Sequence, residues 1–226
     1  MSAIRYVPTG GTLAVASSPC YGLVLVSAVL IEPTTIPTSL ELPGSIRFSE
    51  SDFVEICRRN PDRHIELEAN GDITIMAPSG GETSRMNGKM SLALGKWAEV
   101  HGGIVLDSSG GFRLPNGAIR SPDAAWFATE RWEAVSLAER EGFPNLAPDF
   151  LIELVSPSDT LARQIAKMEE YAANGVRLGW LVIPATREVR IHRPGHTVPE
   201  IHLRPDALSA GPEVLPGFVL DFAPIW

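Results

Sequence analysis

The alternation of apolar and polar positions predicts helices from near residue 45 onward. The predicted helices cover residues 48–56, 82–100, 130–140 and 159–174. Ser49 or Ser51 would cap the first helix, and Asn60-Pro61 would end it. The second is long and amphipathic, the third is polar and on the surface, and Gly175 would end the fourth.

Strand patterns fill the intervals between these helices. Residues 64–68 alternate, Asn70-Gly71 favours a two-residue turn, and residues 73–76 return, which predicts a hairpin. Further strands are expected at 104–107, 111–114, 119–127, 149–155, 178–183, 189–192, 197–203 and 218–221, with a second turn at Asn116-Gly117. Helices and strands in this order predict an α/β fold with a mixed central sheet flanked by helices, preceded by an N-terminal helix and hairpin.

The 226 residues suffice for one domain with a substantial core. Residues 1–44 are rich in Pro, Thr, Ser and Gly without a helical period, and are interpreted as an N-terminal extension before a domain at 45–226. Residues 21–31 are apolar but too short for a bilayer, which needs about 20 residues, so no membrane association is expected.

The net charge of −8 argues against a protein that coats nucleic acid with a broad basic surface. It is compatible with an enzyme that holds a divalent cation, because a carboxylate site itself adds negative charge. Two cysteines, Cys20 and Cys57, make no disulfide framework, and a reducing cytoplasm is the simplest location.

Glu153 is a lone acid in the apolar run Phe150–Val155. A buried carboxylate is costly unless it is paired or bound to a metal. An arginine partner or a solvent-reaching strand end would also explain it. Asp123 follows Pro122, where it could simply close a turn. Taken together, the two acids at strand ends could present adjacent oxygen ligands to Mg²⁺.

Lys167 shares a flank of its predicted helix with Gln164 and Tyr171, from which it could reach Glu153. A solvated surface lysine is the plainer alternative. Glu66 in the hairpin could either face solvent or add an acid beside the metal.

Three other sequence patterns are weaker evidence for a functional site. His192, His196 and His202 could suggest zinc, but their spacing follows no known finger or helical pattern. Ser79-Gly80-Gly81 could cradle an anion, although a helix start explains it better. The last strand and Trp226 would complete the core or form a dimer contact.

The chain resembles the Uma-two family of restriction endonucleases, within the PD-(D/E)xK nuclease superfamily, from about Phe48 to Trp226. The resemblance is carried by residues 76–83, 111–117, 121–126, 153–159, 171–180 and 215–218. It implies a restriction-endonuclease-like fold. It also implies that Asp123 and Glu153 bind metal, and that Lys167 and Glu66 complete the catalytic set. The superfamily lysine two residues after the acid is absent, since Val155 stands there. Ile165 likewise stands where the family often has glutamine, with Gln164 beside it.

These observations lead to the hypothesis of an endonuclease that hydrolyses DNA phosphodiester bonds with Mg²⁺, or alternatively Mn²⁺. Asp123, Glu153 and the backbone carbonyl of Leu154 would hold the ion, and Lys167 would orient the attacking water. The alternative hypothesis is an inactive nuclease fold that binds nucleic acid or protein. A homodimer would suit an enzyme that cuts both strands.

Overall fold

The computed structural model describes residues 47–76 and 78–226, which belong to one compact unit spanning residues 38–226. The predicted N-terminal extension, residues 1–44, lies outside the described residues. Across the two described ranges, no helix combines the length and apolar character that a membrane span requires.

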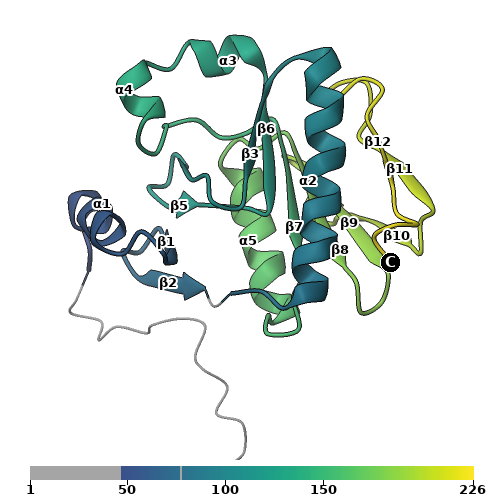
Figure 1. Ribbon diagram of the computed structural model, residues 1–226, viewed down its shortest axis with the longest axis horizontal. Helices are drawn as coiled ribbons and strands as arrows, with labels where there is room; N and C mark the ends of the chain where they lie inside the picture. The colour runs from purple at the N-terminus through teal and green to yellow at the C-terminus, as the bar shows by residue number, and fades with distance from the viewer. Residues whose placement is uncertain (1–46, 77) are drawn as a thin grey trace, which may run out of the picture. The chain divides into compact units, whose positions relative to one another are not determined.

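A six-stranded mixed sheet forms the centre of the unit, in the order β10-β9-β8-β7-β6-β3 (Figure 1). Its strands are β3 (Ile104–Asp107), β6 (Ala124–Phe127), β7 (Phe150–Leu154), β8 (Leu178–Ile183), β9 (Glu188–His192) and β10 (Glu200–Leu203). Only β7 and β8 run parallel to each other among these pairs. Both are buried along their whole length, which explains their nearly continuous apolar sequences.

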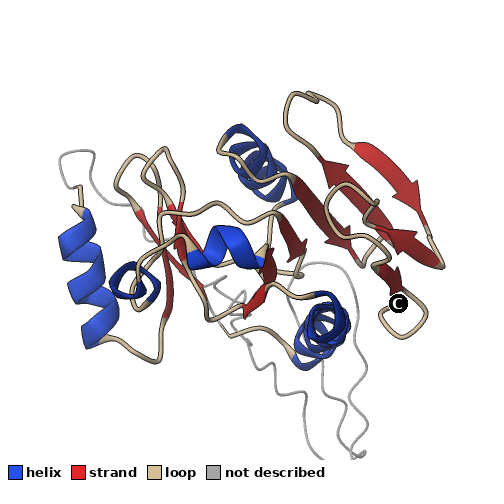
Figure 2. Cartoon of the chain, turned by 90° about the horizontal axis from the view of Figure 1, so that it is seen from above, coloured by secondary structure: helices blue, strands red, loops and turns tan. Residues whose placement is uncertain are grey.

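Two long helices cover opposite faces of this sheet (Figure 2). The helices are α1 (Glu50–Arg59), α2 (Gly81–His101), α3 (Thr129–Glu133), α4 (Leu137–Arg140) and α5 (Leu161–Ala173). Leu94 of α2 shares a buried cluster with Ile152 of β7, whereas Met168 of α5 shares one with Leu151. Successive strand residues point to opposite faces, so Glu153 faces the side that α5 covers.

The N-terminal hairpin belongs to a smaller sheet with the order β2-β1-β5-β4, and α1 packs against this sheet through Phe53. Its strands are β1 (His64–Leu67), β2 (Ile73–Met76), β4 (Phe112–Arg113) and β5 (Ile119–Arg120). The first helix begins and ends as predicted, because Ser49 and Asp52 form a capping box and Asn60 follows the last turn.

The prediction of one strand over residues 119–127 was wrong. The chain leaves the small sheet after Arg120 and enters the central sheet at Ala124. Pro122 lies in the break, where its missing N–H interrupts the ladder. This interruption brings Asp123 to the end of the central sheet.

The predicted two-residue turn at Asn70-Gly71 is a three-residue loop instead, and the predicted hairpin turn at Asn116-Gly117 has the same length. Residues 69–71 and 115–117 each connect antiparallel strands, and the last residue of each loop is glycine at positive φ, +87° for Gly71 and +90° for Gly117. Such a loop places a left-handed residue after the turn, a conformation that glycine adopts without strain.

Two further differences concern surface segments. The polar helix predicted at 130–140 is split into α3 and α4, because Ser136 starts a new helix with its own capping box to Glu139. Strand β11 (Ala207–Ser209), which is not among the predicted strands, pairs with β12 (Val219–Asp221). At the C-terminus, Trp226 stacks on Phe222 with centroids 4.9 Å apart and packs on the core cluster.

Candidate active site

Asp123 lies in the bend between the two sheets, beside the end of β7. Its Oδ2 accepts a hydrogen bond from the main-chain N–H of Leu154 at 2.8 Å, and its Oδ1 accepts one from the Asn87 amide at 2.7 Å. Burial and the nearby charge of Glu153 raise the pKa of Asp123 to about 7. The carboxyl is therefore only partly ionised at neutral pH in the absence of a cation.

Glu153 lies next to Asp123 across the β6–β7 ladder. The register pairs Ala124 with Ile152, so the following position on β7 comes opposite Asp123. Burial raises the pKa of Glu153, even though its Oε1 lies 2.8 Å from Lys167 Nζ and 2.8 Å from the Tyr171 hydroxyl. The site thus holds two acids that resist carrying two negative charges at once.

Lys167 projects from the middle of α5 and joins two carboxylates. Its Nζ lies 2.8 Å from Glu153 Oε1 and 2.9 Å from Glu66 Oε1. Burial opposes the charged amine, but Glu153 and Glu66 outweigh it and raise the pKa of Lys167. With a side chain only 12% exposed, Lys167 is not the solvated surface lysine of the plainer alternative.

Glu66 faces the interior and not solvent. The residue is 2% exposed. It accepts the main-chain N–H of Ser121 at 2.8 Å and lies 3.3 Å from Arg120 Nη1. Burial disfavours its ionised form, yet Lys167 and Arg120 prevail and lower the pKa of Glu66. The structure therefore brings Glu66, Glu153 and Lys167 into direct contact, with Asp123 beside Glu153.

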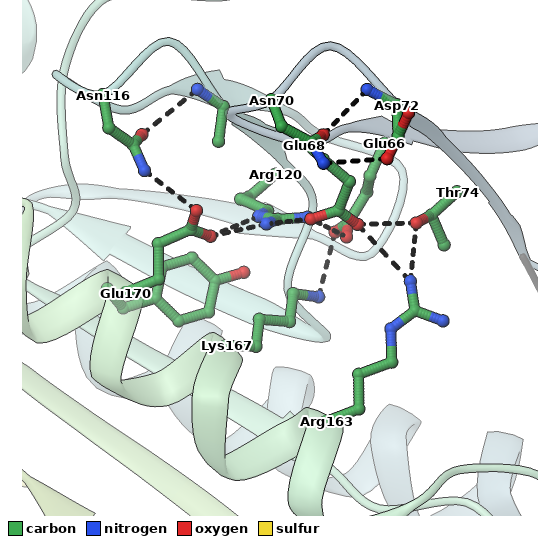
Figure 3. A network of polar contacts seen from close by, with 12 residues as sticks. Glu66, Glu68, Asn70, Asp72, Thr74, Asn116, Arg120, Arg163, Lys167 and Glu170 are labelled. Atoms are coloured by element: carbon green, nitrogen blue, oxygen red, sulfur yellow. Dashed lines mark hydrogen bonds and ion pairs between the residues drawn. The ribbon is translucent and has the colours of Figure 1, made fainter. Parts of the chain in front are cut away.

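Arg120 is a central residue that sequence reasoning missed. It is buried at the end of β5, and Figure 3 shows its guanidinium among carboxylates from β1 and α5. Its Nη2 lies 2.6 Å from Glu68 and 2.6 Å from Glu170. Burial opposes ionisation of Glu68, but the bonds from Arg120 lower its pKa to about 2. A basic residue in a predicted strand directly before Ser-Pro-Asp was the available signal.

Asn87 and Tyr171 also act on the two acids, one from each covering helix. Asn87 lies beside the apolar stripe of α2, and Ser91 one turn later donates to its amide oxygen at 3.2 Å. Tyr171 lies one turn after Lys167, on the predicted flank of α5, and is buried. A polar pair one turn apart along an apolar stripe could have indicated Asn87.

A pocket of about 250 Å³ opens beside Lys167. Its lining residues are Glu66, Glu68, Thr74, Met76, Arg120, Asp159, Arg163, Gln164, Ala166, Lys167 and Glu170. Asp123 and Glu153 do not line it, although they are the predicted metal ligands. The pocket therefore gives access to the Glu66 side of the Lys167 contact.

The donor set can be tested against a divalent cation. Within residues 47–76 and 78–226, no group of three or more His, Cys, Asp or Glu could hold a metal by itself, and this includes the predicted histidines. Mg²⁺ needs no such group, because it accepts one or two carboxylates and retains several waters. Asp123 and Glu153 supply two carboxylates.

Leu154 can supply a main-chain oxygen on the same side. In an antiparallel ladder, the N–H and C=O of one residue point toward the same neighbouring strand. The N–H of Leu154 points to Asp123, so its carbonyl faces that side too. An all-oxygen set of this kind fits a hard cation such as Mg²⁺ or Mn²⁺.

The charges of the surrounding network favour a divalent ion. The connected carboxylates are Asp123, Glu153, Glu66, Glu68 and Glu170, and the connected cations are Lys167, Arg120 and Arg163. Among the described residues the acids of this network outnumber the bases, and Asp159 adds a further negative charge near Asp123, so a bound cation would reduce the repulsion.

The other residues considered from the sequence line the pocket, pack in the core, cap a helix or form a surface ion pair. Gln164 lines the pocket, while Ile165 packs against the apolar cluster under α5. Gly80 is the N-cap of α2, which confirms the helix-start interpretation of Ser79-Gly80-Gly81. His202 Nε2 lies 2.7 Å from Glu200 on β10.

Comparisons with known proteins agree with this architecture. The family model described as "Putative restriction endonuclease" matches residues 50–223. A solved structure from Anabaena variabilis, titled a putative nuclease, is similar with a TM-score of 0.60 and 19% identity over 71% of this chain and 88% of that one. No curated protein matches the chain. The predicted fold is confirmed, and nuclease-like function is supported. Because the family model spans most of the sequence, the chain belongs to the Uma2 family, described as putative restriction endonucleases.

Proposed function

We propose that this protein is an endonuclease that hydrolyses DNA phosphodiester bonds with Mg²⁺, for which Mn²⁺ can substitute. The observation that carries the proposal is the position of Lys167 Nζ. It lies 2.8 Å from Glu153 and close enough to Asp123 for its charge to act on the pKa of that acid. Two acids and an amine from three separate segments thus meet at one end of the central sheet.

Asp123, Glu153 and the carbonyl of Leu154 would hold the cation. When bound, such an ion polarises the scissile phosphate and makes a bound water more acidic. The protein contributes the arrangement of the ligands: Asn87 and the Leu154 N–H orient Asp123, and Tyr171 orients Glu153. Cation binding would also relieve the repulsion that raises the pKa of both acids.

Lys167 would supply the positive charge of the site. As a protonated amine it can orient the attacking water and stabilise negative charge that develops on the phosphate oxygens. Glu66 keeps Lys167 charged and, from the pocket side, could orient a water of the metal shell. Arg120 would act indirectly, by fixing the carboxylate of Glu66.

The family description, "Putative restriction endonuclease", supports the choice of DNA as substrate, and the similar structure from Anabaena variabilis is titled a putative nuclease. We place the activity in the cytoplasm, where the DNA and a reducing environment for cysteine are found. Because the chain has a net charge of −8, the binding of DNA would depend on the bound cation more than on a basic protein surface.

The test is nicking of supercoiled plasmid with Mg²⁺, Mn²⁺, Ca²⁺ or EDTA. Cleavage with Mg²⁺ or Mn²⁺ that is lost with EDTA and in the Asp123→Asn and Lys167→Met variants supports the proposal. DNA binding without cleavage under every condition would instead support the inactive binding module. Cleavage of RNA alone would contradict the choice of DNA.

A further inference from the structure

The amine of Lys167 lies between two carboxylates, 2.8 Å from Glu153 and 2.9 Å from Glu66. Many enzymes that cleave phosphate esters hold two metal ions about 4 Å apart. Asp123 and Glu153 supply carboxylates for one ion. A second ion beside it would need carboxylate oxygens on the pocket side of Lys167, where Glu66 lies (Figure 3). The contacts of the acids on that side therefore decide how many ions the protein can hold.

Both oxygens of the Glu66 carboxylate already have partners. Oε1 accepts the main-chain N–H of Ser121 at 2.8 Å and lies 2.9 Å from Lys167 Nζ. Oε2 lies 3.3 Å from Arg120 Nη1. A divalent ion at Glu66 would therefore meet two side-chain cations, and like charges repel strongly at a site as buried as this one. Moving either cation away would leave a buried charge without its partner.

The other acids that line the pocket also have partners within the protein. Arg120 Nη2 lies 2.6 Å from both Glu68 and Glu170 (Figure 3). Asp159 Oδ2 accepts hydrogen bonds from the main-chain N–H and the hydroxyl of Ser156, at 2.8 Å and 2.7 Å. These carboxylates neutralise a buried guanidinium or hold the turn before α5. A second ion on the pocket side would have to replace those partners.

We propose that the protein holds one divalent cation and that Glu66 is a positioning residue for Lys167, not a metal ligand. The inference rests on the proposed function, from which it takes the ion between Asp123 and Glu153. Lys167 then supplies the positive charge that a second ion would bring. Its ammonium group has three N–H donors, and since Glu66 and Glu153 accept two of them, their positions fix the direction of the third. Glu66 thereby helps to direct the donor that is left for the attacking water.

The number of Mn²⁺ ions that the full chain binds tests the inference. Isothermal titration calorimetry should give one equivalent of bound Mn²⁺, and the electron paramagnetic resonance spectrum should be that of an isolated ion. Two ions about 4 Å apart would instead give the spectrum of a coupled pair. A second equivalent that produces a coupled spectrum would overturn the single-ion inference and leave the nuclease proposal intact. A chain that binds no ion would overturn both.

Glu66→Gln tests whether Glu66 is a ligand. The amide keeps the size of the side chain but loses its negative charge. We expect this variant to bind one Mn²⁺ with the spectrum of the parent, and loss of the ion would overturn the inference. Glu133→Gln, at an exposed position of α3, should change neither the number of ions nor the cleavage rate. The ion count of the parent still decides the inference where circular dichroism shows that Glu66→Gln is unfolded.

A double-variant cycle tests whether Glu66 acts through Lys167. Glu66→Gln should slow plasmid nicking by about 10-fold or more in the parent, because the amine is no longer held in position. In the Lys167→Met background it should have little further effect, since the amine is already gone. Equal factors in both backgrounds would overturn the positioning role. One bound ion without any nicking by the parent would overturn the proposed cleavage but not the single-ion site.

Discussion

The amine of Lys167 and the carboxylate of Glu153 lie 2.8 Å apart, although they come from a helix and from the strand that this helix covers. Val155, two residues after Glu153, points to the same face of the sheet and packs against the cluster under α5. We propose that Lys167 of α5, above the same face, takes the place of the amine that a Glu-x-Lys motif would supply from the strand.

The proposed supply of the amine from α5 can be tested by moving the amine from position 167 to position 155, at the end of β7. If the proposed function holds, Lys167→Met should lower the cleavage rate by about 100-fold or more, because the charge beside the proposed metal ligands is lost. Val155→Lys in that background should recover part of the rate. Lys96→Met, at an exposed position of α2, should leave the rate unchanged. A Lys167→Met enzyme as fast as the parent would remove Lys167 from the mechanism.

When no metal is present, ionised Asp123 should lower the free energy of unfolding. Its folded pKa of about 7 lies above the unfolded value near 3.8, so the folded state holds the proton more tightly between these pH values. The contribution of Asp123 to stability then falls as pH rises through this window. Asp123→Asn should raise the free energy of unfolding at pH 8 by about 1–3 kcal/mol, measured by urea unfolding in EDTA. A gain of the same size at pH 4 would contradict this cause.

Metal binding should compete with protons at the same acids. Because Asp123 must lose its proton to act as a ligand, affinity for Mn²⁺ should rise from pH 6 to pH 8 and level off above the pKa near 7. Isothermal titration calorimetry across this range gives the affinity, and Asp123→Asn should remove the dependence. Affinity that does not change with pH would mean that the ion binds elsewhere.

Tyr171 should tune Glu153 without touching substrate. Tyr171→Phe keeps the ring in its buried place but removes the 2.8 Å hydrogen bond to Glu153. We expect a stability loss of about 1–2 kcal/mol and an acidic limb of the activity profile that moves to higher pH, since the ionised carboxylate loses a donor. A loss of stability with an unmoved pH profile would indicate a purely structural role.

Arg120 should be the most sensitive position for folding. Arg120→Met leaves the buried acid Glu66 and the half-buried acids Glu68 and Glu170 without their shared cation, which should cost about 3–5 kcal/mol. Urea unfolding measures this cost. Arg58→Met, which removes only an exposed pair with Glu55, should cost less than about 1 kcal/mol. Similar effects of the two variants would show that the buried network contributes little.

Much of the fold could be predicted from local patterns. Helix α1 follows from its capping residues, α2 and α5 follow from apolar spacing, and β7 follows from an apolar run that a strand covered on both faces explains. The split between β5 and β6 could not, because both halves have strand-forming sequences. Which sheet each half joins depends on distant partners, Leu67 for β5 and Leu151 for β6.

By itself, the sequence determined the types of side chain available at the site: acids at 66, 123 and 153 and a lysine at 167, all in segments with a clear local structure. Only the tertiary structure decided that Glu66 turns inward, that Arg120 joins the β1 acids to α5, and that Asn87 orients Asp123. The physical reason is that burial and charge pairing arise between residues far apart in the chain. Local propensity specifies an element and its faces, whereas the free energy of a buried charge depends on what the rest of the fold places against it.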